Sequence, residues 1–140
     1  MPDFGLMIVD DDEADRYCLK RLLKAAGIEA TVFEASDGRE ALDFLSDSDA
    51  RAELGSTFPP AILFLDINMP RMNGFDFLKE FSRVRNDQFE EMAVLIVTSS
   101  HDTIDTKAAN EFDFVRGYIE KQPRSSAELK AEIASYLPGN

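Results

Sequence analysis

The sequence predicts an α/β fold, a doubly wound parallel sheet of five strands with helices on both faces. Five short apolar segments alternate with five segments whose apolar residues recur at helical spacing. Three of the apolar segments contain no polar residue, which is typical of strands buried on both faces of a parallel sheet. Because right-handed crossovers leave few topologies, we expect the strand order 2-1-3-4-5, with its switch point between the first and third strands.

The element boundaries follow from the apolar pattern and from capping residues. The expected strands are residues 5–9, 30–35, 61–65, 93–97 and 115–120, and the expected helices are residues 13–26, 38–46, 74–84, 102–112 and 126–137. Asp12 is expected to cap the start of the first helix, and Gly27 its end. Asp37 and Ser125 are each followed three residues later by glutamate, the capping-box spacing. The polar segment 47–60 is predicted to be a loop that extends the preceding helix first.

Length and composition predict one folded domain, residues 1–140. A hydrophobic content of 44% is that of a folded protein, and a net charge of −12 argues against direct binding to nucleic acid or to anionic membranes. With Cys18 as the one cysteine there is no internal disulfide, and a reducing compartment is expected. No apolar stretch is long enough to span a membrane and no secretory signal is seen, so we expect a cytoplasmic protein.

Polar side chains with complementary chemistry follow the predicted strands. Asp10 and Asp11 follow the first strand, Asp66 the third, Thr98 the fourth and Lys121 the fifth. The carboxyl ends of parallel strands meet at one edge of the sheet, and open α/β folds bind their ligands at that edge near the switch point. We therefore expect these five side chains to form one site.

The chemistry of this set points to phosphate and a hard cation. Two carboxylates about 4 Å apart repel by roughly 4 kcal/mol at an effective dielectric constant near 20, so the cluster should raise a pKa or bind a cation. Carboxylate oxygens without cysteine or histidine favour Mg²⁺ over zinc. Mg²⁺, the Lys121 ammonium and the Thr98 hydroxyl can each contact phosphate oxygens. Asp66 can then act as a carboxylate nucleophile that forms an aspartyl phosphate.

Four segments together carry a resemblance to a known family. In chain order they read IVDDDEAD, LFLDINMPRMNG, VLIVTSS and GYIEKQP. The chain resembles the receiver domain of two-component response regulators, in a stand-alone form, and the resemblance covers essentially its whole length. It implies a flavodoxin-like fold similar to that of chemotaxis regulators. The length of segment 47–60 resembles the small regulators partnered with bacterial phytochromes.

The resemblance implies a phosphoacceptor and a metal site. Asp66 would accept the phosphoryl group and contribute to the metal site. Asp11 would be a direct ligand of Mg²⁺, and Asp10 would bind it through water or assist Asp11. Asn68 would coordinate through its backbone carbonyl.

The resemblance also implies a switch. The Thr98 hydroxyl would move toward the phosphoryl group, and Lys121 would be its cationic partner. Tyr118 matches the aromatic position that turns inward when Thr98 moves. Gln122 stands where the family usually has proline, often after a cis peptide bond. A cis bond before a non-proline residue costs about 2.5–4 kcal/mol, which disfavours it after Lys121.

The leading prediction is a phosphorylation switch rather than an enzyme. A histidine kinase or a histidine phosphotransfer protein would phosphorylate Asp66. The signal would pass to a downstream protein through the face made by residues 102–112, 115–120 and the last helix, and a homodimer through that face is compatible with the sequence. His101, the only histidine, is interpreted as a surface residue.

Three alternatives remain open at this point. The first is a degenerate receiver that acts as an unphosphorylated scaffold. The second is an Mg²⁺-dependent phosphohydrolase with an aspartyl nucleophile, which usually has a second acid where this chain has Asn68. The third is a redox protein of the flavodoxin type, in which residues 10–12, three aspartates, would repel the cofactor phosphate.

Overall fold

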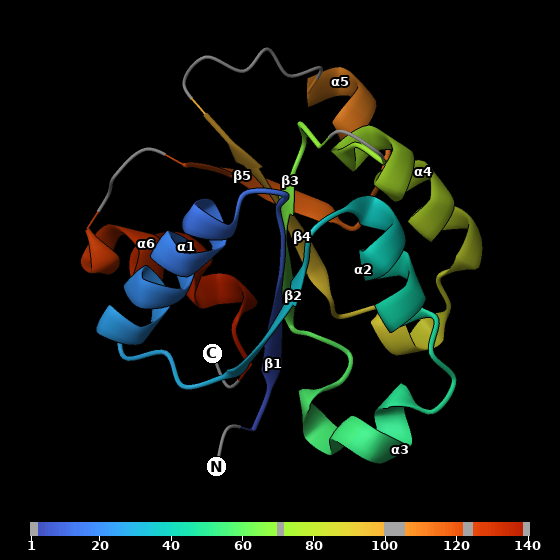
Figure 1. The fold of residues 1–140 in the computed structure, drawn as a ribbon, viewed down its shortest axis with the longest axis horizontal. Coiled ribbons are helices and arrows are strands. Elements are labelled where there is room, and N and C mark those ends of the chain that lie inside the picture. The colour runs from blue at the N-terminus through green and yellow to red at the C-terminus, as the bar shows by residue number, and fades with distance from the viewer. Residues whose placement is uncertain (1–2, 70–71, 100–105, 122–124, 139–140) are drawn as a thin grey trace.

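The chain forms a five-stranded, entirely parallel sheet between two layers of helices (Figure 1). The computed structural model describes residues 3–69, 72–99, 106–121 and 125–138. The strands are β1 (Gly5–Val9), β2 (Thr31–Ala35), β3 (Ile62–Asp66), β4 (Ala93–Thr98) and β5 (Val115–Glu120). Their order is β2-β1-β3-β4-β5, which confirms the predicted fold class.

The helices lie on both faces of the sheet, as Figure 1 shows. On one face lie α1 (Glu13–Ala25) and α6 (Ser126–Ile133), and on the other lie α2 (Gly38–Leu45), α4 (Gly74–Val84) and the short α5 (Thr106–Ala109). The additional helix α3 (Ala50–Leu54) lies near the amino ends of the strands, away from the edge where β1 and β3 end (Figure 1). The carboxyl edge of the sheet is therefore left for the polar side chains that follow the strands.

The core is divided in two by the sheet, because successive strand residues point to opposite faces. Leu6 and Ile8 of β1 belong to the cluster beneath α1 and α6, and Met7 and Val9 belong to the cluster beneath α2 and α4. The central strands β1, β3 and β4 are buried along their whole length. This double burial explains why their sequences contain so few polar residues, and it fixes the level at which each strand ends.

The predicted helix caps are confirmed. The Asp12 carboxylate accepts the N–H of Ala14 at 2.8 Å, and the Asp37 carboxylate accepts the N–H of Glu40 at the same distance. The Ser125 hydroxyl oxygen accepts the N–H of Glu128 at 3.1 Å. After α1 the backbone turns through Gly27, whose φ of 77° is the left-handed conformation that favours glycine at this position.

The predicted loop 47–60 was wrong in its central part. It contains α3 and a turn of 3₁₀ helix at Gly55–Thr57, while α2 ends at Leu45 and is not extended. Ala50 and Phe58 are buried, and the Phe58 ring packs edge-on against Phe44 with centroids 5.5 Å apart. This burial stabilises a segment that its polar composition alone assigned to a loop.

Two further helices differ from the prediction. The helix expected over 102–112 ends at Ala109, because the chain then turns and Phe112 donates its N–H to the Ala109 carbonyl. Residues 102–105 of that helix, with His101 and Gln122, lie outside the described residues. The last helix ends at Ile133 and continues as a 3₁₀ turn over Ala134–Tyr136, where the Tyr136 hydroxyl donates to the Arg116 carbonyl at 2.9 Å.

Gly74 allows the chain to return closely from Asp66 to α4, which yields a first prediction. A Cβ at Gly74 would lie 2.8 Å from the Ile67 Cα and 3.0 Å from the Asp66 carbonyl oxygen. Backbone cannot give way as a side-chain end can, so we expect Gly74→Ala to lower the free energy of unfolding by about 1–3 kcal/mol in urea titrations. The control is Gly117→Ala, whose Cβ would meet only side-chain atoms, 3.3 Å or more away. An equal loss in both variants would contradict the steric argument.

Candidate functional site

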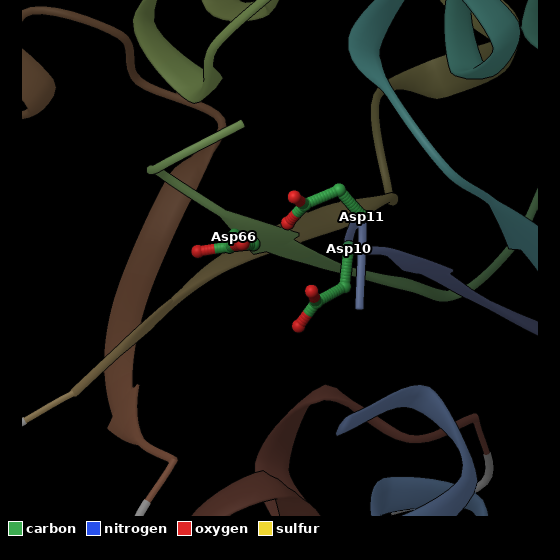
Figure 2. Close-up of side chains that lie close together, drawn as sticks. All are labelled: Asp10, Asp11 and Asp66. Atoms are coloured by element: carbon green, nitrogen blue, oxygen red, sulfur yellow. The ribbon is translucent and has the colours of Figure 1, made fainter. Parts of the chain in front are cut away.

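The carboxyl ends of β1 and β3 bring three carboxylates together (Figure 2). The two strands are hydrogen-bonded neighbours, with Val9 opposite Leu65, so the next residues along the chain, Asp10 and Asp66, meet at the edge of the sheet. Asp10, Asp11 and Asp66 each offer an oxygen that lies within 4.8 Å of the others. Asp10 and Asp66 are only 5% and 3% exposed, whereas Asp11 is exposed. The predicted convergence of these acids is thus present in the structure.

Asp10 is fixed by its neighbours on three sides. Its N–H donates to the Ala35 carbonyl at 3.0 Å, and its Oδ1 accepts the N–H of Asp12 at 2.9 Å. Its own carbonyl accepts a hydrogen bond from Arg16 of α1 at 2.6 Å. Arg16 is in turn paired with Glu34 of β2 at 3.0 Å. The main chain at Asp10 is therefore tied both to the neighbouring strand and to the helix that follows it.

The two oxygens of Asp66 have different partners. Oδ1 accepts the N–H of Asn68 at 3.2 Å, and Oδ2 lies 3.4 Å from the Lys121 Nζ. The first contact is local and follows from the turn that begins after β3. The second brings in a cation from the far end of the sequence.

Lys121 places its ammonium among the acids. Its N–H donates to the Thr98 carbonyl, which extends the pairing of β4 and β5 by one residue. Its Nζ lies 3.0 Å from Asp15, 3.1 Å from Asp10 and 3.4 Å from Asp66. Burial alone would lower the pKa of this ammonium, but its hydrogen bond to Asp15 and the charges of Asp10 and Asp66 raise that pKa above its ordinary value.

One lysine does not neutralise the cluster. Burial raises the pKa of the Asp66 carboxyl to about 6, and the negative charge of Asp10 acts in the same direction, while Lys121 opposes the increase. Burial likewise raises the pKa of Asp10. Both shifts mean that the folded protein holds ionised carboxylates at a cost, which the binding of a cation would reduce.

The other predicted residues are placed as follows. Thr98 ends β4 and is 8% exposed, one residue beyond the partner of Asp66 in the β3–β4 register. Asn68 is exposed and contacts Asp66 through its N–H. Tyr118 is 37% exposed, and its hydroxyl lies 2.8 Å from the Asn110 Oδ1 beside α5, away from the carboxylates. The structure thus brings Asp10, Asp11, Asp66 and Lys121 together and leaves Tyr118 outside this group.

Sequence reasoning missed two residues, Asp15 and Arg16. Both lie in the first turns of α1. At that position the sequence alone suggests that an acidic residue interacts with the helix dipole and that a basic residue is a surface charge. Asp15 contacts Lys121 across 106 residues of sequence, so no local pattern could pair them. The available indication was that Asp15 lies in the first turn of the helix that starts at the site.

The donor set fits a hard divalent cation. It consists of three carboxylates without cysteine or histidine, and oxygen ligands of this kind suit Mg²⁺. The surplus negative charge beside Lys121 favours a divalent cation electrostatically.

In the described part of the chain, no helix has the length and apolar character needed to cross a membrane.

Comparison with models of protein families identifies the family of this chain. The family model of the response regulator receiver domain matches residues 6–134. The chain belongs to this family. Its members are signalling proteins of the two-component systems and not enzymes in the ordinary sense. The segments that carried the resemblance in the sequence lie within the matched region.

Individual relatives support the same assignment. Chemotaxis protein CheY1 of Helicobacter pylori is 33% identical over 136 residues, which are 96% of this chain and 98% of that protein. Sensor histidine kinase CheAY of the same organism is 34% identical over 97 residues, but the chain spans only 11% of its length. The solved structure of the bacteriophytochrome response regulator RtBRR has a TM-score of 0.72 and 25% identity, covering 97% of this chain and 78% of that one.

The buried charge of Asp66 yields a prediction about stability. In protein freed of divalent cations, Asp66→Asn should raise the free energy of unfolding at neutral pH by up to about 3 kcal/mol. The reason is that folding raises the pKa of Asp66 to about 6, from about 3.9 in an unfolded chain. The wild-type penalty is therefore absent below the unfolded pKa, grows as the pH rises between the two values, and is complete above the folded one.

Urea titrations from pH 4 to pH 8 in the presence of a chelator measure this effect. The matched control is Asp49→Asn, which removes an exposed carboxylate at the start of α3 that makes no side-chain capping bond there. The difference between wild type and Asp66→Asn should vary with pH, whereas the difference for Asp49→Asn should stay nearly constant. Parallel curves for all three proteins would contradict the argument.

Proposed function

We propose that the protein is a response regulator that accepts a phosphoryl group on Asp66 and transmits the signal through protein contacts. The observation that carries this proposal is the position of a buried Asp66 beside two further carboxylates and the Lys121 ammonium. The receiver family to which the chain belongs supports it as well.

In the proposed step, a carboxylate oxygen of Asp66 attacks the phosphorus of a phosphohistidine. A P–O bond forms and the P–N bond breaks, and the leaving imidazole nitrogen takes a proton from water. Asn68 and Lys121 hold the two oxygens of the carboxylate in place, so the nucleophile is oriented before the donor arrives. No general base is required, because Asp66 is mostly ionised at neutral pH with a pKa of about 6.

Asp10, Asp11 and Asp66 would hold Mg²⁺, with the Asn68 carbonyl as a further proposed ligand. When bound, the ion supplies positive charge to the oxygens of the phosphoryl group. Lys121 would contribute a second positive charge as a hydrogen-bond donor, and Thr98 a hydroxyl.

The phosphodonor is proposed to be a histidine kinase or a histidine phosphotransfer protein. The output would go to a protein partner, because a net charge of −12 disfavours direct contact with DNA. A bacterial phytochrome kinase is one candidate donor, since the similar structure RtBRR is described as a bacteriophytochrome response regulator. A cytoplasmic location suits a donor of this kind and a chain with one cysteine.

The direct test is intact-mass spectrometry after incubation with acetyl phosphate and Mg²⁺. We expect the wild type to gain one phosphoryl group, Asp66→Asn to gain none, and the gain to vanish in the presence of a chelator. Asp11→Asn should lower the phosphorylation rate at limiting Mg²⁺ and recover partly at high Mg²⁺, because it removes one carboxylate of the cluster. Asp49→Asn should behave as wild type.

The outcomes separate the proposed function from its alternatives. Phosphorylation that persists in Asp66→Asn would exclude Asp66 as the acceptor. Absence of phosphorylation from acetyl phosphate and from a phosphorylated histidine donor would favour the unphosphorylated scaffold. Steady release of phosphate from many small phosphomonoesters would instead indicate a phosphohydrolase.

The proposed switch gives a further prediction about Thr98. Phosphorylation should change hydrogen exchange in α5 and β5, which lie next to the carboxyl end of β4. Thr98→Val keeps the shape of the side chain but lacks the hydroxyl, so it should still accept the phosphoryl group while losing about half or more of the exchange change. Hydrogen-exchange mass spectrometry of the segment from Thr106 to Glu120 measures this.

The control for Thr98 is Thr31→Val. Thr31 is a half-buried threonine at the start of β2, the strand at the opposite edge of the sheet from β5. It should leave the exchange change intact. An undiminished change in phosphorylated Thr98→Val would show that the hydroxyl does not carry the signal.

A further inference from the structure

The Lys121 ammonium has three hydrogen atoms and three carboxylate neighbours. The neighbours are Asp15, Asp10 and Asp66, at 3.0, 3.1 and 3.4 Å. An ammonium group can donate three hydrogen bonds and no more. A new acceptor, such as a phosphoryl oxygen on Asp66, can therefore be bonded only if Lys121 gives up one of its present partners.

The three partners differ in how easily they can be given up. The side chains of Asp10 and Asp66 are 7% and 3% exposed, whereas that of Asp15 is 42% exposed. Water can replace the lysine at an exposed carboxylate at small cost, but a buried carboxylate that loses its cation stays unsatisfied. Loss of the contact with Asp15 therefore costs Lys121 less free energy than loss of the contact with Asp10 or Asp66.

Asp15 also differs from the other two partners in its position. It lies on α1 and is not part of the carboxylate cluster that fits a cation, which consists of Asp10, Asp11 and Asp66. A cation in that cluster would compete with Lys121 for Asp10 and Asp66 and would leave the contact with Asp15 intact. With the cation bound, Asp15 thus becomes the main anchor of the ammonium.

A small cavity next to this contact gives the lysine room to move. Its volume is about 60 Å³, and it is bordered by Lys121 and its three carboxylate partners together with apolar side chains that include Leu19 and Leu22. An ammonium group cannot rest against apolar side chains without a partner. The position of the Lys121 side chain is therefore decided by competition among acceptors, and not by steric confinement.

From these observations we infer that Asp15 is a positioning residue that holds Lys121 in the unphosphorylated protein and competes with the phosphoryl group for it. The inference rests on the proposed function, because it requires a phosphoryl group on Asp66. Asp15 acts only through Lys121, so it sets how strongly the protein favours the state in which Lys121 contacts the phosphoryl group. Removal of Asp15 should strengthen that contact.

The test uses beryllofluoride, which forms a tetrahedral adduct on a carboxylate and imitates a phosphoryl group. Binding in the presence of saturating Mg²⁺ is followed by the ¹⁹F NMR signals of the bound fluorides. We expect Asp15→Asn to bind the analogue roughly three- to fivefold more tightly than wild type, the scale of a partly exposed ion pair. Asp15→Glu, which restores a carboxylate, should return the affinity toward that of wild type.

The matched control is Asp12→Asn. It removes one negative charge from the same end of α1, asparagine caps a helix as well as aspartate, and Asp12 is not among the ion-pair partners of Lys121 in the described residues. Its effect on the affinity should stay below about twofold, because an exposed charge is screened by salt. Circular dichroism verifies that each variant is folded.

A double-mutant cycle isolates the contact with Lys121. In a Lys121→Gln background, Asp15→Asn should change the affinity by less than about twofold, since the residue through which it acts is gone. An equal gain in both backgrounds, or equal effects of Asp15→Asn and Asp12→Asn, would reduce Asp15 to a general electrostatic contribution and overturn the inference. No binding to wild type, with Asp66→Asn indistinguishable from it, would overturn the proposed function as well.

Discussion

The carboxyl edge of this sheet is organised by a charge imbalance that the fold itself creates. Two carboxylates are buried at the ends of adjacent strands, a third lies beside them, and a single ammonium is shared between the buried pair and Asp15. Folding raises the pKa of Asp66 to about 6, so the folded chain keeps ionised groups together at the expense of stability. The arrangement persists because the surrounding structure holds these charged residues in place. That surrounding structure is the buried centre of the sheet.

The burial of the central strands is what holds the site in place. Strands β1, β3 and β4 are buried on both faces, so their register and their ends are fixed by two separate hydrophobic clusters. Asp10 and Asp66 are the residues at which two of these strands reach the edge. A hydrogen bond from the Asp10 N–H to the Ala35 carbonyl and one from the side chain of Arg16 to the Asp10 carbonyl then hold Asp10. The turn after β3 is closed by a hydrogen bond from the Gly74 N–H to the Ile67 carbonyl. The site is thus built mainly from elements that the core requires in any case.

This origin explains which features the sequence could predict. The uninterrupted apolar runs predicted buried parallel strands, and polar residues directly after them predicted one shared edge, because both follow from local pattern and general topology. Helix α3 was missed, since its stability comes from the burial of Ala50 and from the packing of Phe58 against Phe44, which no local pattern reveals. The ion pair between Asp15 and Lys121 was missed for a similar reason, because it joins residues 106 positions apart. The outward position of Tyr118 likewise depends on its contact with Asn110 beside α5.

The same geometry separates what is fixed in the site from what can change. The main chain of Lys121 is bonded to the Thr98 carbonyl, so the backbone at the ends of β4 and β5 is held by the sheet. The ammonium group, at the end of four flexible methylene groups, has three competing acceptors and a cavity beside it. A new anion at Asp66 would therefore first cause the Lys121 side chain to exchange one of its acceptors for another. This exchange would leave the packing of the core almost unchanged. Because that side chain starts from the strand pair that also carries Thr98 and Tyr118, the exchange takes place where a local change in charge can reach the surface around α5.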